Sequence, residues 1–120
     1  MRMERVEFIT TDSGDDLIVS FAIGRTDPGE IRSLILMRTP KYEFTLDDSE
    51  RGVSVSDEDR DEDDADLLEE IEFRGYEVRI VSRKADYQLD CSRADAEELD
   101  EAKKTLHAMN FDNRSRIHVS

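Results

Sequence analysis

Residues 56–66 read SDEDRDEDDAD, and this acidic stretch divides a strand-rich first half from a second half that ends in a helix. Residues 57–66 hold eight carboxylates and one arginine, so their net charge is −7, half of the −14 carried by the 120-residue chain. Residues 56–64 contain no apolar side chain, and nothing local offsets the cost of about 1–2 kcal/mol for ordering each backbone residue. The stretch predicts a mobile acidic loop at residues 57–66 within a single domain that spans residues 1–120.

The first half is dominated by short alternating or apolar runs that predict β-strands. In the first run Val6 and Phe8 share a face, and the second run is apolar on both faces, which is typical of an interior strand covered on both sides. Tyr42, Phe44 and Leu46 alternate with polar residues and predict the clearest one-sided strand. The predicted strands of this half are residues 5–11, 17–24, 31–37, 41–46 and 53–56.

The second half begins with an ambiguous segment, residues 67–74, which fits either a helical turn or a strand. We favour a strand from Glu70 onwards, because Tyr76, Val78 and Ile80 alternate directly after Gly75 and complete a hairpin. Further strands are expected at residues 87–91 and 117–119, and the tyrosines Tyr42, Tyr76 and Tyr87 are expected on core faces.

A helix is predicted to start at Ser92 or Asp95. Its apolar stripe has helical spacing and consists of Ala96, Leu99, Ala102, Leu106 and Met109. Asp95 and Glu98 resemble a capping box, and Asn110 is a plausible C-cap. Because an isolated helix of about fifteen residues is marginal in water, the stripe must pack on the sheet. The fold class is therefore α+β: a mostly antiparallel sheet of about seven or eight strands, curled or split into a sandwich, with one C-terminal helix packed on it.

The negative charge favours some partners over others. A phosphate backbone and an anionic membrane surface both repel such a chain, so we expect no nucleic-acid partner and no membrane association. A basic protein is the favoured partner, although high acidity also keeps a protein soluble and monomeric. The chain start lacks the apolar core of a signal peptide, and no apolar run is long enough to span a membrane. These features predict a cytoplasmic protein.

We expect the acidic loop to present carboxylates to a basic protein, as in a small inhibitor or immunity-type protein. The predicted partner-binding residues are Asp57, Glu58, Asp59, Asp61, Glu62, Asp63 and Asp64. Such charge raises the association rate more than the affinity. A homo-oligomeric structural protein, such as a homodimer, is an alternative.

A metal-binding regulatory module is a second alternative. Asp59, Asp61, Asp63 and Glu70 occupy positions 1, 3, 5 and 12 of a Ca²⁺ loop counted from Asp59. The pattern departs from that loop at position 6, where Asp64 replaces the glycine of the sharp turn, so specific Ca²⁺ binding is not our prediction.

Catalytic signals are few. The chain contains two histidines, His107 and His118, and one cysteine, Cys91. Each histidine is expected at the surface, and Cys91 is expected to be a buried core thiol that cannot form a disulfide within the chain. The common nucleotide, hydrolase and zinc motifs are missing from the sequence. We therefore predict a non-enzymatic protein without a cofactor, and an enzyme using paired carboxylates in a cleft stays open as an alternative.

Three stretches are similar to parts of a known group. They are LMRTPKYE at residues 36–43, ERGVSVSDED at residues 50–59 and MNFD at residues 109–112. Together they resemble a group of small bacterial proteins of unknown function, over residues 31–112. The resemblance implies a bacterial cytoplasmic origin and a β-rich fold, and it implies no activity.

Overall fold

Eight strands and one long helix make up the fold in the computed structural model, which describes residues 3–25, 29–60 and 66–119. The strands are β1 (Glu4–Ser13), β2 (Leu17–Gly24), β3 (Ile31–Arg38), β4 (Ser54–Asp57), β5 (Leu68–Arg74), β6 (Glu77–Ser82), β7 (Asp86–Asp90) and β8 (Arg116–Val119). The helix is α1 (Ala96–Met109), and two short 3₁₀ helices, η1 (Pro40–Thr45) and η2 (Asp48–Glu50), follow β3. The predicted α+β class, with one C-terminal helix on a sheet, is confirmed.

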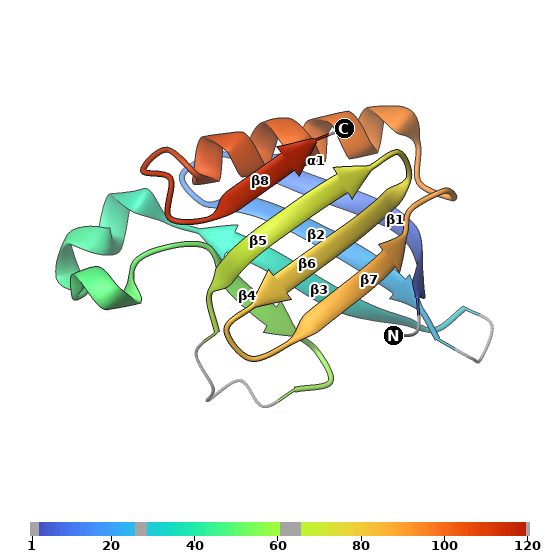
Figure 1. Ribbon diagram of the computed structural model, residues 1–120, viewed down its shortest axis with the longest axis horizontal. Coiled ribbons are helices and arrows are strands. Elements are labelled where there is room, and N and C mark those ends of the chain that lie inside the picture. The colour runs from blue at the N-terminus through green and yellow to red at the C-terminus, as the bar shows by residue number, and fades with distance from the viewer. Residues whose placement is uncertain (1–2, 26–28, 61–65, 120) are drawn as a thin grey trace.

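The strands form one sheet in the order β4-β3-β2-β1-β7-β6-β5-β8. Its neighbours are antiparallel, except that β1 runs parallel to β7 and β5 runs parallel to β8. The contact between β1 and β7 pairs only Glu4 with Leu89 and Arg5 with Asp90, and Figure 1 shows β5–β7 crossing in front of β1–β3. A bridge between Ser54 and Leu67 then connects β4 back to the start of β5. The sheet is therefore curled.

The core lies between the two halves of the curled sheet and α1, which packs against β1 and β2. Phe21, Phe73 and Leu106 are fully buried there, and each such burial contributes about 1.5–3 kcal/mol. No helix among the residues that the structure describes is long and apolar enough to cross a membrane.

The start of α1 is attached to the sheet. Asp95 is the N-cap residue but its side chain makes no capping hydrogen bond, so the predicted capping box does not form. Glu98 instead accepts a hydrogen bond from the backbone N–H of Ile9, with a distance of 3.0 Å to Oε1. This long-range hydrogen bond gives the N–H of Ile9 in β1 an acceptor. In the predicted capping box, Glu98 would instead have accepted a hydrogen bond from the backbone N–H of Asp95 at the helix start. Asn110 is the C-cap, as predicted.

A β-bulge changes which side chains of β1 face the core. The register shifts between Val6 and Phe8, so Val6 and Ile9 are both buried while Phe8 is exposed. A bulge adds one residue to one strand and reverses the alternation beyond it. The expectation that Val6 and Phe8 share a face is therefore wrong.

The predicted strand at residues 41–46 is also wrong, because these residues form η1. Pro40 has no N–H for a sheet ladder, and its fixed φ suits the first turn of a helix. Local bonds replace the ladder: Tyr42 N donates to Thr39 O and Leu46 N donates to Glu43 O. Tyr42 is exposed, contrary to expectation.

The second half largely follows the prediction. The ambiguous segment is strand β5, and its hairpin with β6 turns at Gly75, which has a positive φ of 61°. Tyr87 is buried as predicted, whereas Tyr76 lies exposed next to that turn.

Strand β2 is interior in the sheet, yet only one of its faces belongs to the core. Val19 and Phe21 join the core cluster, whereas Ile18 and Ala22 on the opposite face do not. Within residues 3–25, 29–60 and 66–119 no helix or strand packs on that second face. The predicted cover on both sides is therefore wrong for the described part of the chain.

Candidate functional site

The first end of the acidic segment is buried. Asp57, the last residue of β4, is only 9% exposed. Its Oδ1 accepts hydrogen bonds from Arg32 Nε and from the backbone N–H of Asp59, both at 3.0 Å, and its Oδ2 accepts one from the Tyr87 hydroxyl at 3.1 Å. Such partners compensate the cost of burying a carboxylate. Asp57 is therefore not available to a partner, and it is removed from the predicted partner-binding residues.

The second end of the acidic segment is buried as well. Asp66 accepts hydrogen bonds from Ser82 Oγ at 2.6 Å, from the backbone N–H of Lys84 at 3.2 Å and from Arg60 Nη1 at 3.2 Å. Its backbone carbonyl accepts a hydrogen bond from Val55 N at 2.9 Å. The chain thus leaves the sheet after β4 and returns beside the same strand, which fixes both ends of the segment at one place.

Two further carboxylates of this segment are exposed but paired. Arg25 Nη2 lies 3.1 Å from Glu58 Oε2 and 2.7 Å from Asp59 Oδ1. The hydrogen bond from Arg25 lowers the pKa of Asp59, which keeps that carboxyl ionised at neutral pH. Arg32 also lies 3.7 Å from Asp59. The described part of the segment is therefore an ionic network in which Arg25 and Arg32, from elsewhere in the chain, and Arg60, within the segment, balance the carboxylates.

The remaining predicted partner-binding residues lie outside the described residues, and so does most of the predicted mobile loop. They are Asp61, Glu62, Asp63 and Asp64. Of the Ca²⁺ candidates, Asp61 and Asp63 fall in the same gap, and Asp59 is paired with Arg25. Glu70 lies in β5 within 3.2–3.5 Å of Arg79, Arg116 and His118. The described residues contain no group of three or more side chains placed to hold a metal ion.

A second ionic cluster surrounds Arg38 at the end of β3. This side chain is buried, and all five of its N–H groups donate hydrogen bonds. Nε and Nη2 donate to Glu43 at 2.7 and 2.9 Å, and Nη1 and Nη2 donate to Asp112 at 2.8 Å each. Nη1 also donates to the carbonyl of Met109 at 2.7 Å, at the end of α1. Arg38 therefore joins the sheet, η1 and the helix C-terminus.

The charges in this cluster are strongly coupled. Burial alone would lower the pKa of Arg38, but its hydrogen bonds to Asp112 and Glu43 outweigh burial and raise it. The hydrogen bonds from Arg38 and then from Arg114 hold the pKa of Asp112 well below its usual range. Arg114 extends the cluster to η2, because it pairs with Asp48. Arg38 and Asp112 therefore stabilise each other's charged form.

This cluster exposes the apolar side chains of η1. Because Glu43 points inward to Arg38, its neighbours Tyr42 and Phe44 are 58% and 77% exposed. Phe111 stacks on the Arg38 guanidinium, with 4.2 Å between Cζ and the ring centroid, and is itself exposed. We call Tyr42, Phe44, Leu46 and Phe111 the aromatic surface. Exposed carboxylates follow directly along the chain at Asp47, Asp48 and Glu50.

Sequence reasoning predicted a one-sided strand for this segment, so both the element and its buried face were assigned wrongly. Tyr42 and Phe44 flank Glu43. Phe111 stacks on the arginine that Glu43 contacts, so the three exposed rings surround one cluster. Exposed aromatic side chains are a common mark of a binding site. The available signal was Pro40 immediately before the alternating residues, since a proline there favours a helical turn over a sheet ladder.

The candidate catalytic residues are not brought together. Cys91 is fully buried, as predicted, and burial raises the pKa of its thiol to about 12. His107 is exposed in the last turn of α1, and His118 is exposed on β8 beside Glu70. The described carboxyls whose pKa is shifted, namely Asp48, Asp59, Asp90 and Asp112, are all shifted downward. None of these four is therefore prepared as a general acid.

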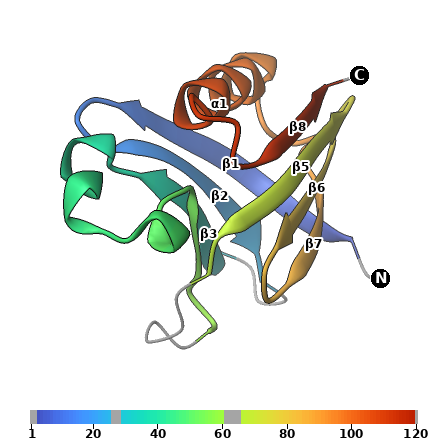
Figure 2. The ribbon, with the colours of Figure 1, turned by 60° about the vertical axis from the view of Figure 1, so that its left-hand side comes forward.

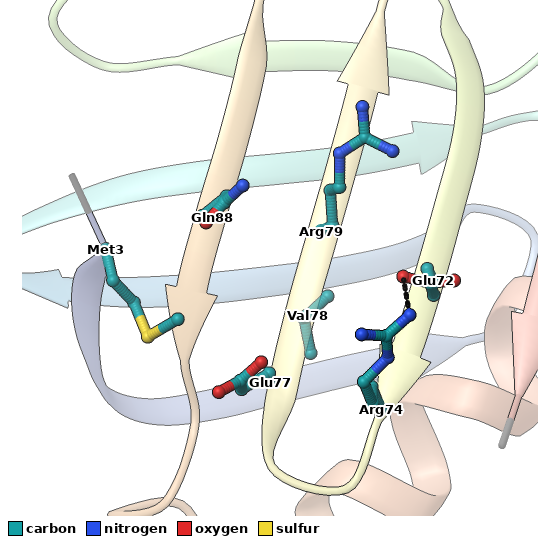
Figure 3. Close-up of a pocket in the computed structure, with 7 residues that line it drawn as sticks. All are labelled: Met3, Glu72, Arg74, Glu77, Val78, Arg79 and Gln88. Carbon is teal, nitrogen blue, oxygen red and sulfur yellow. Dashed lines mark ion pairs between the residues drawn. The ribbon is translucent and has the colours of Figure 1, made fainter. Parts of the chain in front are cut away.

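A shallow depression lies on the solvent side of β5–β7 (Figure 3). Its lining residues are Met3, Glu72, Arg74, Glu77, Val78, Arg79 and Gln88. Arg74 pairs with Glu72 of the same strand at 3.5 Å (Figure 3), and Arg79 pairs with Glu70 at 3.4 Å. Its arginines therefore already have carboxylate partners, and it offers no buried polar group for a ligand.

Comparison with protein-family models, with curated proteins and with solved structures gives no match for this chain. The resemblance to small bacterial proteins therefore stays a prediction, and the function is argued from the molecule itself.

Proposed function

We propose that this protein is a non-catalytic binding protein for a basic protein partner, in the manner of a small inhibitor. The proposal depends on one observation, the exposed aromatic surface, which consists of side chains on η1, directly after it and after α1, beside exposed carboxylates. Aromatic anchors surrounded by polar groups are the usual composition of an interface that binds tightly.

The Arg38 cluster supports this proposal because it holds η1 in place before any partner arrives. An irregular segment of this kind is normally mobile, but Glu43 of η1 accepts two hydrogen bonds from the buried Arg38 guanidinium of β3. The other three hydrogen bonds of that guanidinium go to Asp112 and to the carbonyl of Met109 at the end of α1. A rigid surface loses less conformational entropy on binding than a mobile one.

The charge supports a basic partner in particular. The chain carries 31 acidic and 17 basic residues, and a negative field of this kind speeds the approach of a cationic protein. Arginine and lysine side chains of a partner also stack favourably on exposed aromatic rings, with about 0.5–2 kcal/mol for each contact. The exposed carboxylates of the acidic loop would then speed the approach of the partner, and the aromatic surface would bind it once it has arrived.

The test is titration with a synthetic peptide in which arginine and leucine alternate, measured by fluorescence anisotropy at low salt. We expect Phe44→Ser to weaken binding about tenfold, the effect of losing a moderate anchor. A matched control is Tyr76→Ser, which removes an exposed aromatic side chain from the β5–β6 turn and should leave affinity unchanged. A peptide in which arginine and serine alternate has the same charge and should bind at least about tenfold more weakly. Equal losses in the Phe44 and Tyr76 variants would refute the aromatic surface as the anchor.

The attracting role of the acidic loop is tested by the rate of association. The neutralised variant changes Glu58→Gln, Asp59→Asn, Asp61→Asn, Glu62→Gln, Asp63→Asn and Asp64→Asn, and it keeps the buried Asp57. We expect association with the same peptide to slow several-fold at low salt and to change little at high salt. An unchanged rate at low salt would remove the loop from the proposal.

A further inference from the structure

The outer face of β1–β4 is nearly free of charge, although 40% of the residues of this chain are charged. Cross-strand pairing places Phe8 beside Ala22, Ile18 beside Met37, and Gly24 beside Ile31 on this face. Ile35 lies between Ser20 and Ser56 in the middle of it. We define the neutral face by its apolar members, which are Phe8, Ile18, Ala22, Ile31, Ile35 and Met37.

The remaining central positions of the neutral face carry small hydroxyl side chains. They are Thr10, Ser20, Ser33, Ser54 and Ser56. Small side chains between larger apolar ones allow two sheets to approach to about 10 Å and interdigitate. Charge is found at the margins instead, where Arg5 pairs with Glu7 at 2.9 Å and Asp12 lies opposite Ile18. A neutral centre inside a charged margin is the usual anatomy of a protein interface.

The neutral face does not belong to the core. Apart from Ala22, its apolar members are half-buried or exposed, and none of the six belongs to the core cluster or packs against it. Figures 1 and 2 show α1 and β5–β7 on the opposite side of β1–β3. Among residues 3–25, 29–60 and 66–119, no element covers it. Apolar residues at adjacent positions of one uncovered sheet face, unlike apolar residues scattered singly, mark an interaction surface.

The neutral face approaches the size of a small specific interface. β2, β3 and the paired part of β1 are eight residues long, which corresponds to about 26 Å, whereas β4 has four residues, or about 13 Å, and neighbouring strands lie about 4.8 Å apart. The footprint is therefore about 440 Å² on each molecule, or about 900 Å² for a pair. That total is close to the lower limit of about 1,000 Å² expected for a specific protein interface.

We propose that the neutral face is the interface of a homodimer, in which a second copy of this chain packs face to face on β1–β4. A basic partner would gain little here, because the centre of the face offers no carboxylate. In a two-fold dimer, the same apolar and hydroxyl surface of each copy forms the contact. The excess carboxylates of both copies then lie at the edge of the contact or outside it. The inference does not depend on the proposed function, because it uses a different surface and a different partner.

Salt separates the two proposals, because they predict opposite responses. Each copy carries a net charge of −14, so dimerisation opposes mutual repulsion that salt screens. Sulfate and similar salts also strengthen apolar burial. The dimer should therefore tighten as salt rises, whereas binding of a basic peptide should weaken.

The experiment is sedimentation equilibrium of the full chain between about 0.05 M and about 0.5 M salt. We expect a monomer–dimer equilibrium whose dissociation constant falls at least about tenfold across this range. Ile35→Glu places like charges near the axis and should raise the dissociation constant at least about 100-fold, since opposed like charges cost several kcal/mol. Tyr76→Glu is the matched control and should leave the equilibrium unchanged, because that residue lies outside the neutral face.

Ser20→Glu is the second variant, for the case that Ile35→Glu perturbs folding. Ser20 faces away from the core beside Ile35, so its replacement should raise the dissociation constant about as strongly while the circular dichroism spectrum stays native. A wild-type chain that remains monomeric at high salt and high concentration overturns the homodimer, as does a dimer that both variants leave intact. A monomer that instead binds another protein through these residues would overturn it too.

Discussion

The acidic segment and η1 both bury carboxylates, but they differ in which side chains they leave exposed. In residues 57–66, the most polar part of the chain, Asp57 and Asp66 turn inward while Glu58 and Asp59 stay at the surface. In η1, one carboxylate turns inward and the aromatic residues on both sides of it turn outward. In each region an arginine of β3 pairs with a buried carboxylate: Arg32 with Asp57, and Arg38 with Glu43. These pairs compensate the cost of burying a charged group.

The comparison distinguishes carboxylates that hold the fold from carboxylates that are available to a partner. Glu43 and Asp57 contact Arg38 and Arg32 and are buried, whereas Glu58 contacts the half-exposed Arg25. Net charge alone therefore overstates the anionic surface that a partner would meet. The following changes test the distinction in order of expected size.

Arg38→Met should have the largest effect. It leaves Glu43 buried without its cation, and breaking a buried ion pair from one side costs about 3–5 kcal/mol. Urea unfolding monitored by circular dichroism measures the loss. The matched control is Arg25→Met, which breaks only solvent-exposed pairs and should change stability far less. A smaller loss for Arg38→Met than for Arg25→Met would mean that the buried cluster does not hold the fold.

Asp57→Asn should destabilise the protein by about 2 kcal/mol, since hydrogen bonds to a charged group contribute about 1.5–3 kcal/mol. Its amide keeps one acceptor oxygen but cannot serve both Arg32 and Tyr87 as the carboxylate does. Glu58→Gln, one residue along, is the control and should change stability by less than about 0.5 kcal/mol. Equal effects at both positions would show that Asp57 behaves as a surface carboxylate.

Asp112→Asn should cost about 1–2 kcal/mol at pH 7, and the cost should depend on pH. The pKa of Asp112 is lowered in the folded state by Arg38 and Arg114, so its stabilising contribution is complete above the unfolded pKa of about 3.9 and is lost as pH falls towards the folded value. Urea midpoints of the wild type and the variant should therefore begin to converge as pH falls below about 4 and should continue to converge as pH falls further towards the folded pKa. A difference that is independent of pH would show that the charge of Asp112 is not what stabilises the cluster.

Phe44→Ser should have the smallest effect on folding, within about 0.5 kcal/mol, because the side chain is almost fully solvated. The same variant is expected to weaken peptide binding, so stability and binding would separate at one residue. Thermal unfolding of the wild type and the variant provides the comparison. A loss of 2 kcal/mol or more, typical of a buried aromatic side chain, would mean that Phe44 packs against the protein instead of facing a partner.

Several features could be predicted from the sequence because they depend on local regularity. Alternation in β2, β3 and β6, the apolar stripe of α1 and Asn110 at its end are visible in single segments. The core thiol of Cys91 follows from its place at the end of an alternating strand. These features need only the periods of strand and helix and a single buried side.

Other features could not be predicted, because they depend on a partner far along the chain. Glu98 leaves its capping position for the N–H of Ile9, 89 residues away, and the arginine that buries Asp57 lies on a strand 25 residues earlier. No acid within a run of acids differs in sequence from its neighbours, so only contact with Arg32 or Ser82 distinguishes Asp57 and Asp66.

The sequence by itself determined the class of fold, the negative charge and the order of the strands and helix outside residues 40–50, because hydrophobic period and composition act within a segment. The tertiary structure decided which face of each segment is buried, through the curl of the sheet and the positions of Arg32 and Arg38. A side chain's energy depends on the groups that surround it, and for Glu43, Phe44 and Asp57 those groups are assembled only when distant parts of the chain meet.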